Sequence, residues 1–573
     1  MSDPPRRRWI VPEEPSPPEW LDLSRLLPVP GSILSVLWRR GFREAQTVER
    51  FLQPSLDDLH DPLLLTDCDR AVDRVLRALA DRETIFVFGD YDVDGITAAT
   101  LWTRLLRHLG AKVHVTVPNR MRDGYGLSPN AIAAATEVGA TLLIANDCGT
   151  TAHEAITLAN AAGIDVVVVD HHRPEASLPP AVALVNPHRE GDRYPFRDLC
   201  AVGVAFKILQ AVTARLGDVE AQRFLFNHLD LVAIGSVADV VPLRGENRIF
   251  AHYGMKVLRL RPRPGITALL LAAGLSDKRL ESSHIAFQIA PRLNAAGRLG
   301  RPESALRLLL AEDMDEARLA ADLLERDNFE RRRLHETVLA EALEGVDGAI
   351  VALSQRREAI VLGGTNWHPG VVGIAAARLV ERFGVPVILV ALGEEIGRGS
   401  GRTPSGVDLH ALVGGAARHL SAWGGHKQAV GLSLAPADFP AFRDDLLAQS
   451  RVVLAAGIPA AALQLDGTLE LRACDLAFAQ WIERLGPFGE GNPEPLFYAR
   501  GFCPSTRVLK ERHLRFDILD GGRTLEGIGF GLADRGTDLP TGGAWLQLAF
   551  TPTVNRWRGQ ERVQLKVREV DFV

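Results

Sequence analysis

Acidic residues and histidines follow three short apolar segments in the N-terminal part of this chain. The apolar segments span 85–88, 142–145 and 166–169. The polar residues that follow them are Asp90, Asp92, Asp94, Asp147, Asp170, His171 and His172. Short apolar runs rich in β-branched residues are typical of strands covered on both faces, and helical stretches between them indicate a parallel sheet. Because ligands bind along the edge where the carboxyl ends of parallel strands meet, these side chains are expected to converge there.

Carboxylates that converge in this way repel one another unless cations neutralise them, so the pattern predicts a polynuclear metal site. Asp92 and Asp94 are two residues apart and can reach adjacent metal positions from the end of a strand. Capping of a following helix accounts for one acidic residue here and not for three. Asp147 alone is typical of a helix cap, but beside the other strand ends it is a candidate bridging carboxylate.

The histidine pair indicates which metal ions the predicted site would bind. His171 and His172 directly follow a predicted buried strand, where packing rarely requires two adjacent histidines, although an exposed pair without function is the alternative. Imidazole ligands suit Mn²⁺ or Zn²⁺ better than Mg²⁺. Asp239 follows a further apolar run and adds another carboxylate. Mixed carboxylate and imidazole ligation without cysteine indicates a di-manganese-type centre, whose two ions clamp the attacking and leaving oxygens of a phosphoryl displacement.

Three further segments have the composition of phosphate binders. They are 291–298, with two Arg and an Asn, 397–403, in which Gly alternates with Arg and Ser, and 424–427, with the sequence Gly-Gly-His-Lys. Gly allows backbone N–H groups and Arg side chains to approach an anion closely. Each segment alone is equally typical of an ordinary surface turn. The chain has no GxxxxGK[ST] loop, which argues against a nucleotide-driven motor.

The composition of the 573 residues is that of a globular protein with several domains, with 46% hydrophobic and 24% charged residues. The five cysteines include no CxxC pair, so neither a zinc knuckle nor a disulfide framework is expected. The net charge of −6 does not exclude a nucleic-acid ligand, because binding depends on a local basic surface. No apolar run has the length of a signal peptide core or a membrane span, so we expect a cytoplasmic protein.

The patterns along the chain predict an α/β fold class with five parts. An N-terminal extension spans 1–60, and an α/β domain with a parallel sheet spans 61–260. A long helical connector that includes the Arg and Asn segment spans 261–347. Within it, the helical pattern from Glu303 to about Leu343 reaches up to ~60 Å if it is unbroken. A smaller α/β domain spans 348–455, and an antiparallel β-barrel, for which an OB-fold is one candidate, spans 456–573.

The order of these segments resembles that of the DHH superfamily of phosphoesterases, which is named for the tripeptide found here at 170–172. Segments similar to motifs of its catalytic domain are 89–95, 146–149, 170–172, 235–239 and 291–298. Segments that resemble the associated DHHA1 domain are 367–370, 398–402 and 424–426. Segment 486–493 resembles the lead into the OB-fold of the superfamily's bacterial single-strand-specific exonucleases. The similarity therefore covers nearly the whole chain from about residue 60.

The resemblance implies roles for individual residues. The implied metal ligands are Asp92, Asp94, Asp147, His171 and Asp239, which are also implied catalytic residues together with His172. Asp90, Asp170 and His172 are further candidate ligands, with His172 and Asp170 in or next to the coordination shell. The residues implied to hold the 5′ phosphate of a strand are Arg120, Ser400 and Arg402, and those implied for the scissile and following phosphates are Arg292, Asn294, Arg298, His368, Gly424, Gly425 and His426. Smaller relatives place a His at the position of Phe88, a departure that the exonucleases share.

The implied activity is a metal-dependent 5′-3′ exonuclease that degrades single-stranded DNA to 5′-mononucleotides in DNA repair and recombination. Two divalent metal ions are the implied cofactors, with Mn²⁺ preferred or Mg²⁺ in its place. The implied partners are single-stranded DNA, a single-strand-binding protein and a RecQ-type helicase, and we expect a monomer.

Three alternatives belong to other functional classes. The first is a small-substrate DHH phosphodiesterase that acts on oligoribonucleotides or cyclic dinucleotides. The large C-terminal barrel argues against it, because a small substrate does not require one. A non-catalytic replication scaffold is at odds with the presence of every expected ligand. A metal-binding structural protein of another family has only the ordinary interpretations of each segment in its favour.

Overall fold

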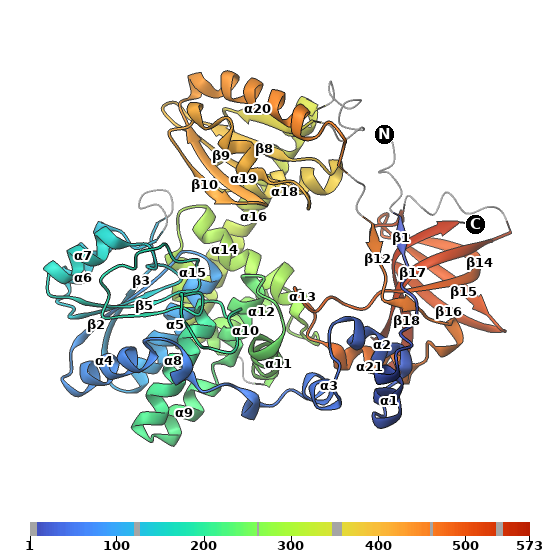
Figure 1. Cartoon of the computed structure of the whole chain (residues 1–573), viewed down its shortest axis with the longest axis horizontal. Helices are drawn as coiled ribbons and strands as arrows, with labels where there is room; N and C mark the ends of the chain where they lie inside the picture. Colours follow the sequence, from blue (N-terminus) through green and yellow to red (C-terminus); the bar gives the residue numbers. More distant parts are fainter. Residues whose placement is uncertain are drawn as a thin grey trace. The chain divides into compact units, whose positions relative to one another are not determined.

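The structure is a computed structural model and describes residues 8–119, 126–260, 263–346, 358–458, 462–533, 542–557 and 559–572. The chain forms two compact units, shown in Figure 1. One unit contains Pro291–Ala305 and Leu319–Ala462, and the other contains Trp9–Ala290, Leu306–Arg318 and Leu463–Val573. No helix in the described ranges has the length and hydropathy needed to cross a membrane.

A five-stranded parallel sheet lies at the centre of the first α/β domain, in the order β3-β2-β4-β5-β6 (Figure 1). Its strands are β2 (Thr84–Gly89), β3 (Lys112–Thr116), β4 (Leu142–Asn146), β5 (Asp165–Val169) and β6 (Ala183–Val185). The parallel sheet predicted from the apolar runs is confirmed. The chain passes from β2 to β3 on one side and then to β4 on the other, so the strand order reverses beside β2. Such reversal points open a crevice at the carboxyl ends of the strands.

Helices on both faces of this sheet explain why its strands are continuously apolar. Their bounds are α4 (Cys68–Ala80), α5 (Val93–His108), α6 (Pro129–Glu137), α7 (His153–Ala161) and α8 (Ala201–Leu216). On one face, Phe88 and Val168 pack with Ile132 of α6 and Ile156 of α7. Helices α4, α5 and α8 contact the sheet and one another. Because side chains alternate between the faces of a strand, every position of the strand must then be apolar.

Helix α10 is buried along its whole length beside this sheet. It packs against α5, α8 and α11, and the helices that continue the domain are α9 (Val219–Phe226), α10 (Leu229–Ala238), α11 (Gly245–Leu260) and α12 (Pro264–Ala272). Gly254 of α11 lies directly against α10, since a Cβ on it would be 2.3 Å from the carbonyl oxygen of Leu229 and 2.5 Å from Cβ of Ala233. The two helices therefore cross closely because Gly254 has no side chain.

The segment predicted as a long helical connector contains several helices. They are α13 (Ser282–His284), a π-helical turn at Ile285–Ile289, α14 (Ala290–Arg298), α15 (Glu303–Leu310) and α16 (Met314–Val346). The helical run is broken before Met314, because the Asp313 carboxylate accepts hydrogen bonds from the N–H groups of Asp315 and Glu316, both at 2.9 Å. The 33 residues of α16 extend over about 50 Å.

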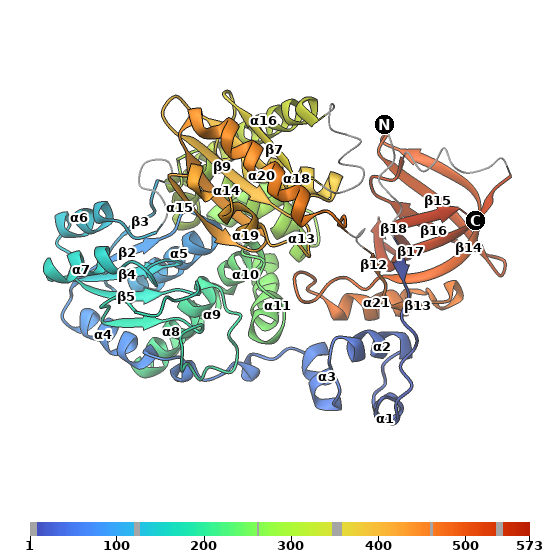
Figure 2. The ribbon, with the colours of Figure 1, turned by 45° about the horizontal axis from the view of Figure 1, so that its top comes forward.

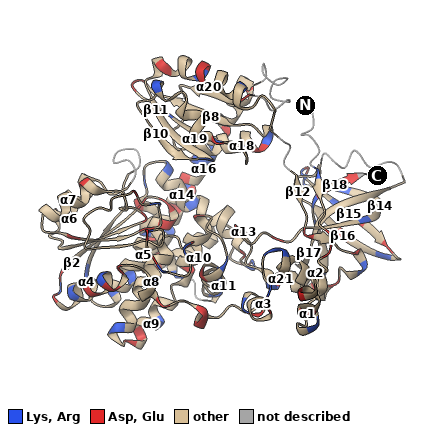
Figure 3. Cartoon of the chain, viewed as in Figure 1, with Lys and Arg blue, Asp and Glu red and all other residues tan. Residues whose placement is uncertain are grey.

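The second α/β domain has a mixed five-stranded sheet in the order β10-β11-β9-β8-β7. Its elements are β7 (Ile360–Gly364), α18 (Val372–Phe383), β8 (Val387–Leu392), β9 (Gly397–Arg402), α19 (Leu409–Gly414), β10 (Ala422–His426), β11 (Ala429–Leu434) and α20 (Phe439–Val453). Only β7 and β8 pair in parallel among the described strands of this sheet. Figure 3 shows acidic and basic residues side by side on many helices, α20 among them.

The prediction of turns at 397–403 and 424–427 is wrong, because both segments form strands. Strand β9 contains the first segment almost entirely, and β10 includes Gly424, Gly425 and His426. Glycine occurs in β9 because large side chains of β11 fill the space beside it. A Cβ on Gly399 would lie 2.7 Å from Leu432, and a Cβ on Gly401 would lie 2.8 Å from Val430.

The C-terminal part is a closed five-stranded barrel of OB type, best seen in Figure 2. The strands run in the order β14-β15-β16-β18-β17, and β17 closes the barrel on β14. Their bounds are β14 (Phe497–Leu509), β15 (His513–Asp520), β16 (Arg523–Gly529), β17 (Ala544–Trp557) and β18 (Gln560–Phe572), preceded by β12 (Leu463–Gln464), β13 (Gly467–Thr468) and α21 (Leu476–Leu485). The predicted barrel is confirmed, although its sequence pattern gave no indication of β16.

The N-terminal helices pack against this barrel. They are α1 (Pro18–Leu26), α2 (Gly31–Arg39) and α3 (Ala45–Leu52), and the short strand β1 (Trp9–Ile10) pairs in parallel with β12. Leu34 and Leu37 of α2 belong to the same apolar core as Ile482 of α21 and Phe497 of β14. The N-terminal extension is therefore part of the barrel's core.

The close crossing of α10 and α11 leads to a stability prediction. Replacing Gly254 with Ala places a methyl group against the backbone of α10, and overpacking of this kind costs about 1–3 kcal/mol. We expect the melting temperature of Gly254→Ala to fall by several degrees in differential scanning calorimetry. The control is Gly31→Ala, where nothing lies within 4 Å of the added Cβ. Equal melting temperatures for the two variants would contradict the close packing.

Candidate metal centre

Acidic residues meet at the crevice where the strand order reverses, at the carboxyl ends of β2, β4 and β5. Three groups of side chains could each hold a metal ion, because within each group the potential ligand atoms lie within 4.8 Å of one another. The groups are Asp90 with Asp92 and Asp147, Asp94 with His171 and Asp239, and Asp147 with His171 and His172. Asp147 and His171 each belong to two groups, so the groups share ligands and form one centre.

Asp92 and Asp94 lie where the loop after β2 leads into helix α5. Asp92 directly precedes the helix, and Asp94 lies in its first turn. Asp92 caps this helix, since its Oδ1 accepts hydrogen bonds from the N–H groups of Asp94 (3.0 Å) and Gly95 (3.2 Å). Gly95 has no room for a side chain, because a Cβ would lie 2.5 Å from the backbone nitrogen of Asp90. The capping interpretation of Asp92 is therefore correct, and it leaves the other carboxylate oxygen of Asp92 for a metal ion.

The buried carboxylate of Asp94 is fixed by the N-terminus of α8. Its Oδ2 accepts a hydrogen bond from the N–H group of Ala201 at 2.6 Å, and its Oδ1 accepts one from Val202 at 2.9 Å. The partial positive charge of a helix N-terminus stabilises a carboxylate at this position. These backbone donors are a part of the site that sequence reasoning missed, and nothing in the sequence near residue 201 pairs it with residue 94.

Asp147 occupies a special backbone position after β4. Its φ of 60° lies in the left-handed region, which is uncommon for a residue with a side chain. Its N–H group donates to the carbonyl oxygen of Val169 at 2.9 Å, and its Oδ1 lies 3.2 Å from Nε2 of His171. This turn directs the Asp147 carboxylate between the ends of β2 and β5, as expected for a bridging ligand.

Asp170 orients the histidine pair. Its Oδ1 accepts hydrogen bonds from the N–H groups of His171 (2.7 Å) and His172 (3.1 Å) and lies 2.8 Å from Nδ1 of His172. Its Oδ2 accepts from the N–H group of Thr150 at 3.1 Å. Among the described residues Asp170 is in none of the three metal-ligating groups. We therefore assign Asp170 the part of a second-layer carboxylate that fixes the ring of His172.

Asp239 reaches the centre from a helix, directly after the C-terminus of α10. Its Oδ2 lies 3.6 Å from Nε2 of His171, and Oδ2 of Asp94 lies 3.7 Å from the same nitrogen. Gly235, one turn earlier on α10, makes this approach possible. A Cβ on Gly235 would lie 2.6 Å from Oγ1 of Thr97 and 3.2 Å from Oδ1 of Asp94.

The electrostatics of the cluster favour bound cations. Burial, followed by repulsion from neighbouring carboxylates, raises the pKa of Asp90 and of Asp239 to about 8 and raises the pKa of Asp147 well above its ordinary value. Burial alone would raise the pKa of Asp170 as well, but hydrogen bonds from His172 and Thr150 hold it well below its usual range. Burial lowers the pKa of His172, and the contact with Asp170 outweighs it and raises this pKa to about 9.

The residues present fit divalent metal ions. Oδ1 of Asp90 is buried and has no hydrogen-bond partner among the described residues, which is costly unless a cation contacts it. The candidate ligands are mostly carboxylates, which suit Mn²⁺ and Mg²⁺, and the imidazoles among them favour Mn²⁺ over Mg²⁺. Cys148 lies next to Asp147, but its side chain packs in the apolar core beneath α6 and α7. Phe88 lies in the same core, where smaller relatives are expected to place a His.

The Arg and Asn segment forms helix α14 of the other unit, in keeping with its place in the predicted helical connector. Arg292 is largely buried, and its Nε lies 2.6 Å from Oε2 of Glu325 on α16. Arg298 donates from Nη1 to the carbonyl oxygen of Gly370 at 3.3 Å, and Asn294 is partly exposed. Nδ1 of His368 accepts a hydrogen bond from the N–H group of Gly370 at 3.0 Å. The structure thus brings Arg298 and His368 to one loop.

The N-terminus of α18 adjoins this loop and two further predicted phosphate-binding residues. A Cβ on Gly373, in the first turn of α18, would lie 2.9 Å from Oγ of Ser400 and 3.2 Å from Nη2 of Arg402. Arg402 donates from Nη1 to Oγ of Ser400 at 2.9 Å. Helix N-termini with an Arg and a hydroxyl group nearby are common anion sites. Arg120, which was assigned to the same phosphate, lies outside the described residues.

Strand β10 extends this surface across the sheet. Arg402 of β9 pairs with Ala429 of β11, which pairs in turn with His426 of β10. One pair further along, Ser400 of β9 pairs with Gly431, which pairs with Gly424. Residues in register point to the same face of a sheet. Open space surrounds Gly424 and Gly431, so the backbone is accessible there. Ser400, Arg402 and His426 thus lie on the same face of the sheet, and on that face Gly424 and Gly431 leave the backbone uncovered.

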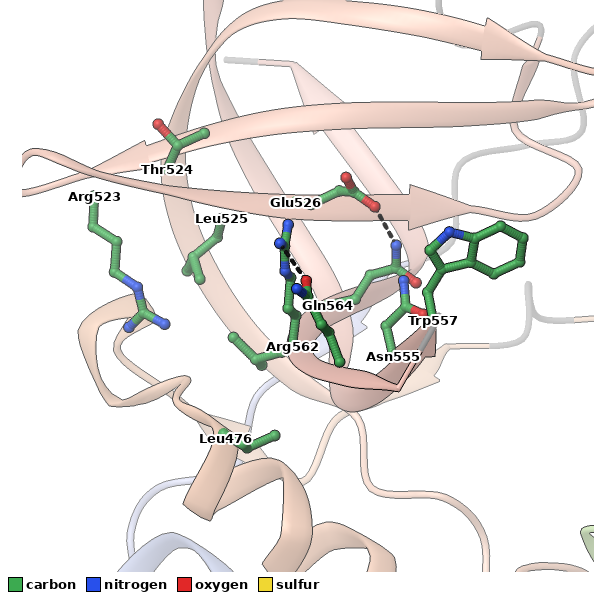
Figure 4. Close-up of a pocket in the computed structure, with 11 residues that line it drawn as sticks. Leu476, Arg523, Thr524, Leu525, Glu526, Asn555, Trp557, Arg562 and Gln564 are labelled. Atoms are coloured by element: carbon green, nitrogen blue, oxygen red, sulfur yellow. Dashed lines mark hydrogen bonds between the residues drawn. The ribbon is translucent and has the colours of Figure 1, made fainter. Parts of the chain in front are cut away.

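An open pocket of about 630 Å³ lies on the barrel between β16 and the β17–β18 hairpin (Figure 4). Its lining includes Arg523, Asn555, Trp557 and Arg562, with Leu525 among its apolar members. The side chain of Trp557 is 71% exposed. Nη2 of Arg562 donates to Oε1 of Gln560 at 2.8 Å. The pocket therefore combines an exposed aromatic ring with cationic groups.

Models of three protein families match this chain. They are the DHH family N-terminal domain at residues 84–236, the DHHA1 domain at 351–450 and the RecJ OB domain at 465–569. These ranges fall within the predicted catalytic, second α/β and barrel domains.

Curated proteins named single-stranded-DNA-specific exonuclease RecJ are similar over nearly the full length. The protein of Dickeya dadantii is 37% identical, with 95% of this chain and 97% of the relative covered. The protein of Escherichia coli is 35% identical, with 93% and 94% covered. The crystal structure of RecJ in complex with Mn²⁺ from Thermus thermophilus matches with a TM-score of 0.82 at 30% identity, and it covers 98% of this chain and 79% of that chain. A structure of the same protein with Mg²⁺ has a TM-score of 0.77.

The raised pKa values predict how metal binding depends on pH. In the metal-free protein Asp90 and Asp239 keep protons up to about pH 8, against an ordinary value of 3.8. The folded state then holds more protons than the unfolded state across this window, so the metal-free fold loses stability as pH rises. Binding must displace these protons, so Mn²⁺ affinity rises with pH. We expect Mn²⁺ to raise the melting temperature more at pH 8 than at pH 6, and equal increments would contradict this electrostatic account.

Proposed function

The chain belongs to the RecJ family of single-stranded-DNA-specific exonucleases, and from this membership we propose that it hydrolyses single-stranded DNA from the 5′ end and releases 5′-mononucleotides. The observation that carries the proposal is the convergence of carboxylates and imidazoles at the ends of three neighbouring strands. Both RecJ structures from Thermus thermophilus contain a divalent ion, Mn²⁺ or Mg²⁺, and the same ions are the proposed cofactors here.

We assign the metal ligands to two overlapping positions. Asp94, His171 and Asp239 serve one position, Asp90 and Asp92 serve the other, and Asp147 bridges them. When bound, two such ions polarise the phosphoryl oxygens and generate a water-derived nucleophile at neutral pH. Asp170 keeps His172 in one orientation through Nδ1, so Nε2 of His172 is available toward the scissile phosphate or its leaving oxygen.

The phosphates of the strand are proposed to bind to residues of the second α/β domain and of helix α14. Ser400 and Arg402 beside the N-terminus of α18 take the terminal 5′ phosphate, since helix dipole and guanidinium act together on a dianion. Arg292, Asn294, Arg298, His368 and His426 bind the scissile and following phosphates. Gly424 and Gly425 are exposed, and the open space at Gly424 and Gly431 allows the strand to approach this face closely.

The other functional classes are not favoured. A small-substrate phosphodiesterase is not favoured because relatives that match over more than nine-tenths of this chain are exonucleases. A scaffold without activity is not favoured because every ligand position carries a carboxylate or an imidazole. A cytoplasmic location and a monomeric state stay predictions from the sequence, and association with a single-strand-binding protein and a RecQ-type helicase stays a prediction from the family resemblance.

The polarity and strand preference can be tested by digesting labelled DNA. We expect immediate release of a 5′ label as a mononucleotide from single-stranded DNA, with Mn²⁺ or Mg²⁺ and not with EDTA, and no release from blunt duplex DNA. Asp147→Asn is expected to reduce the rate at least about a hundredfold, because it removes the bridging charge. Release of the 3′ label first, or full activity of Asp147→Asn, would overturn the proposal.

The barrel pocket supplies a second prediction. Stacking of a base on an exposed aromatic ring contributes about 1–3 kcal/mol, so Trp557→Ala is expected to weaken binding of a long single strand by ~5- to 150-fold. Fluorescence anisotropy with EDTA present measures this without cleavage. Trp545→Ala is the matched control, since Trp545 is also an exposed tryptophan of β17 but does not line the pocket. Equal loss in both variants would show that the pocket has no specific part in binding.

A further inference from the structure

The segment 486–493, with the sequence Gly-Pro-Phe-Gly-Glu-Gly-Asn-Pro, connects α21 to the first barrel strand β14. This segment, here called the 486–493 loop, contacts the chain directly after the ligand Asp239. The N–H group of Leu243 donates to the carbonyl oxygen of Glu490 at 2.8 Å. Nε of Arg244 donates to the carbonyl oxygen of Gly491 at 2.7 Å. The loop therefore bonds to residues four and five positions beyond Asp239.

Two glycines of the 486–493 loop make this approach possible. A Cβ on Gly489 would lie 2.7 Å from Cδ1 of Leu243. Gly491 has a φ of +67°, and a Cβ on it would lie 2.9 Å from Cβ of Pro242 and 3.4 Å from Nε of Arg244. Any side chain at these positions would push segment 242–244 away from the loop. The glycines are thus required by the contact itself as well as by the backbone conformation.

The 486–493 loop is held rigidly by buried hydrogen bonds. Asn492 is 1% exposed, and its Nδ2 donates to the carbonyl oxygens of Leu485 and Pro487, both at 2.9 Å. Its Oδ1 accepts a hydrogen bond from Nη1 of Arg40 at 2.6 Å. Buried Arg248 of α11 donates from Nη1 to the carbonyl oxygen of Leu485 at 2.9 Å. The loop is therefore a fixed surface against which segment 242–244 is placed.

The residue between Asp239 and this contact is strained. Val240 has a φ of +61°, in the left-handed region, which is especially unfavourable for a β-branched side chain. Its side chain is 61% exposed, so packing of Val240 does not compensate for the strain. A strained residue persists where its surroundings determine its conformation. Helix α10 fixes the chain before Val240, and the 486–493 loop fixes it after Val240.

We propose that the 486–493 loop is a positioning element for Asp239 and thereby sets the affinity of one metal position. This inference rests on the proposed metal centre. By holding segment 242–244, the loop keeps Val240 in its strained conformation and keeps the Asp239 carboxylate turned toward Nε2 of His171. Because the loop leads into β14, it connects the segment after Asp239 to the barrel.

The inference is tested by titrating Mn²⁺ into the metal-free full-length protein in a calorimeter, which needs no activity. Gly491→Ala is expected to weaken binding at one Mn²⁺ position about tenfold or more. Gly217→Ala is the matched control, because Gly217 has a φ of +64° with nothing within 4 Å of an added Cβ. Its backbone strain is comparable and its metal affinity is expected to be unchanged.

Two further variants separate positioning from general damage. Arg244→Ala removes the hydrogen bond from an exposed side chain without adding a clash, and a smaller loss of affinity at the same position is expected. Adding Val240→Gly to Gly491→Ala relieves the strain that the loop sustains and is expected to restore part of the lost affinity. Unchanged Mn²⁺ affinity in Gly491→Ala and in Arg244→Ala would overturn the inference, and Arg244→Ala alone decides if Gly491→Ala does not fold.

A fourth variant distinguishes failure of the inference from failure of the metal centre. Asp239→Asn is expected to abolish binding at the position that Gly491→Ala weakens. If Asp239→Asn leaves Mn²⁺ binding unchanged, the proposed ligand set is wrong. If Asp239→Asn removes one ion and the loop variants match the parent protein, the ligand set stands and the positioning part of the loop is refuted.

Discussion

Mutual repulsion among buried carboxylates is the constraint on which the rest of this structure depends. Asp90, Asp94 and Asp147 are each almost completely buried at one edge of a parallel sheet, where burial and like charge raise their pKa values. Such an arrangement is stable as a charged cluster only with cations bound. The topology creates the cluster, because reversal of the strand order beside β2 brings the ends of β2, β4 and β5 around one crevice.

The surrounding elements act against this repulsion by fixing each ligand separately. The N-terminus of α8 holds Asp94, the N–H groups of a turn hold Asp92 as a helix cap, and Asp170 holds His172. Several glycines allow these elements to come close enough. Rigid support of this kind keeps the ligands in place when the metal ions are absent, so that binding does not require the site to be rebuilt.

Much of the centre could be predicted because strands covered on both faces have a plain sequence signature, and the acidic residues directly follow them. Asp239 was identified as a candidate, but an apolar run does not show whether it is a strand or a helix, and α10 is a helix. The glycine-rich segments were interpreted as turns, whereas neighbouring side chains require glycine in β9. Strand β16 has few large apolar residues, so its pairing with β15 and β18 was not visible. Contacts between distant segments, such as Ala201 with Asp94, leave no local signal.

The central claim is that these carboxylates and imidazoles hold two divalent ions at adjacent positions. Anomalous diffraction from crystals soaked in Mn²⁺ tests it most directly. The account predicts two anomalous peaks, one within coordination distance of Asp94, His171 and Asp239 and one within coordination distance of Asp90 and Asp92, with Asp147 between them. A single peak that Asp147 does not contact, or no peak at the ends of β2, β4 and β5, would contradict it.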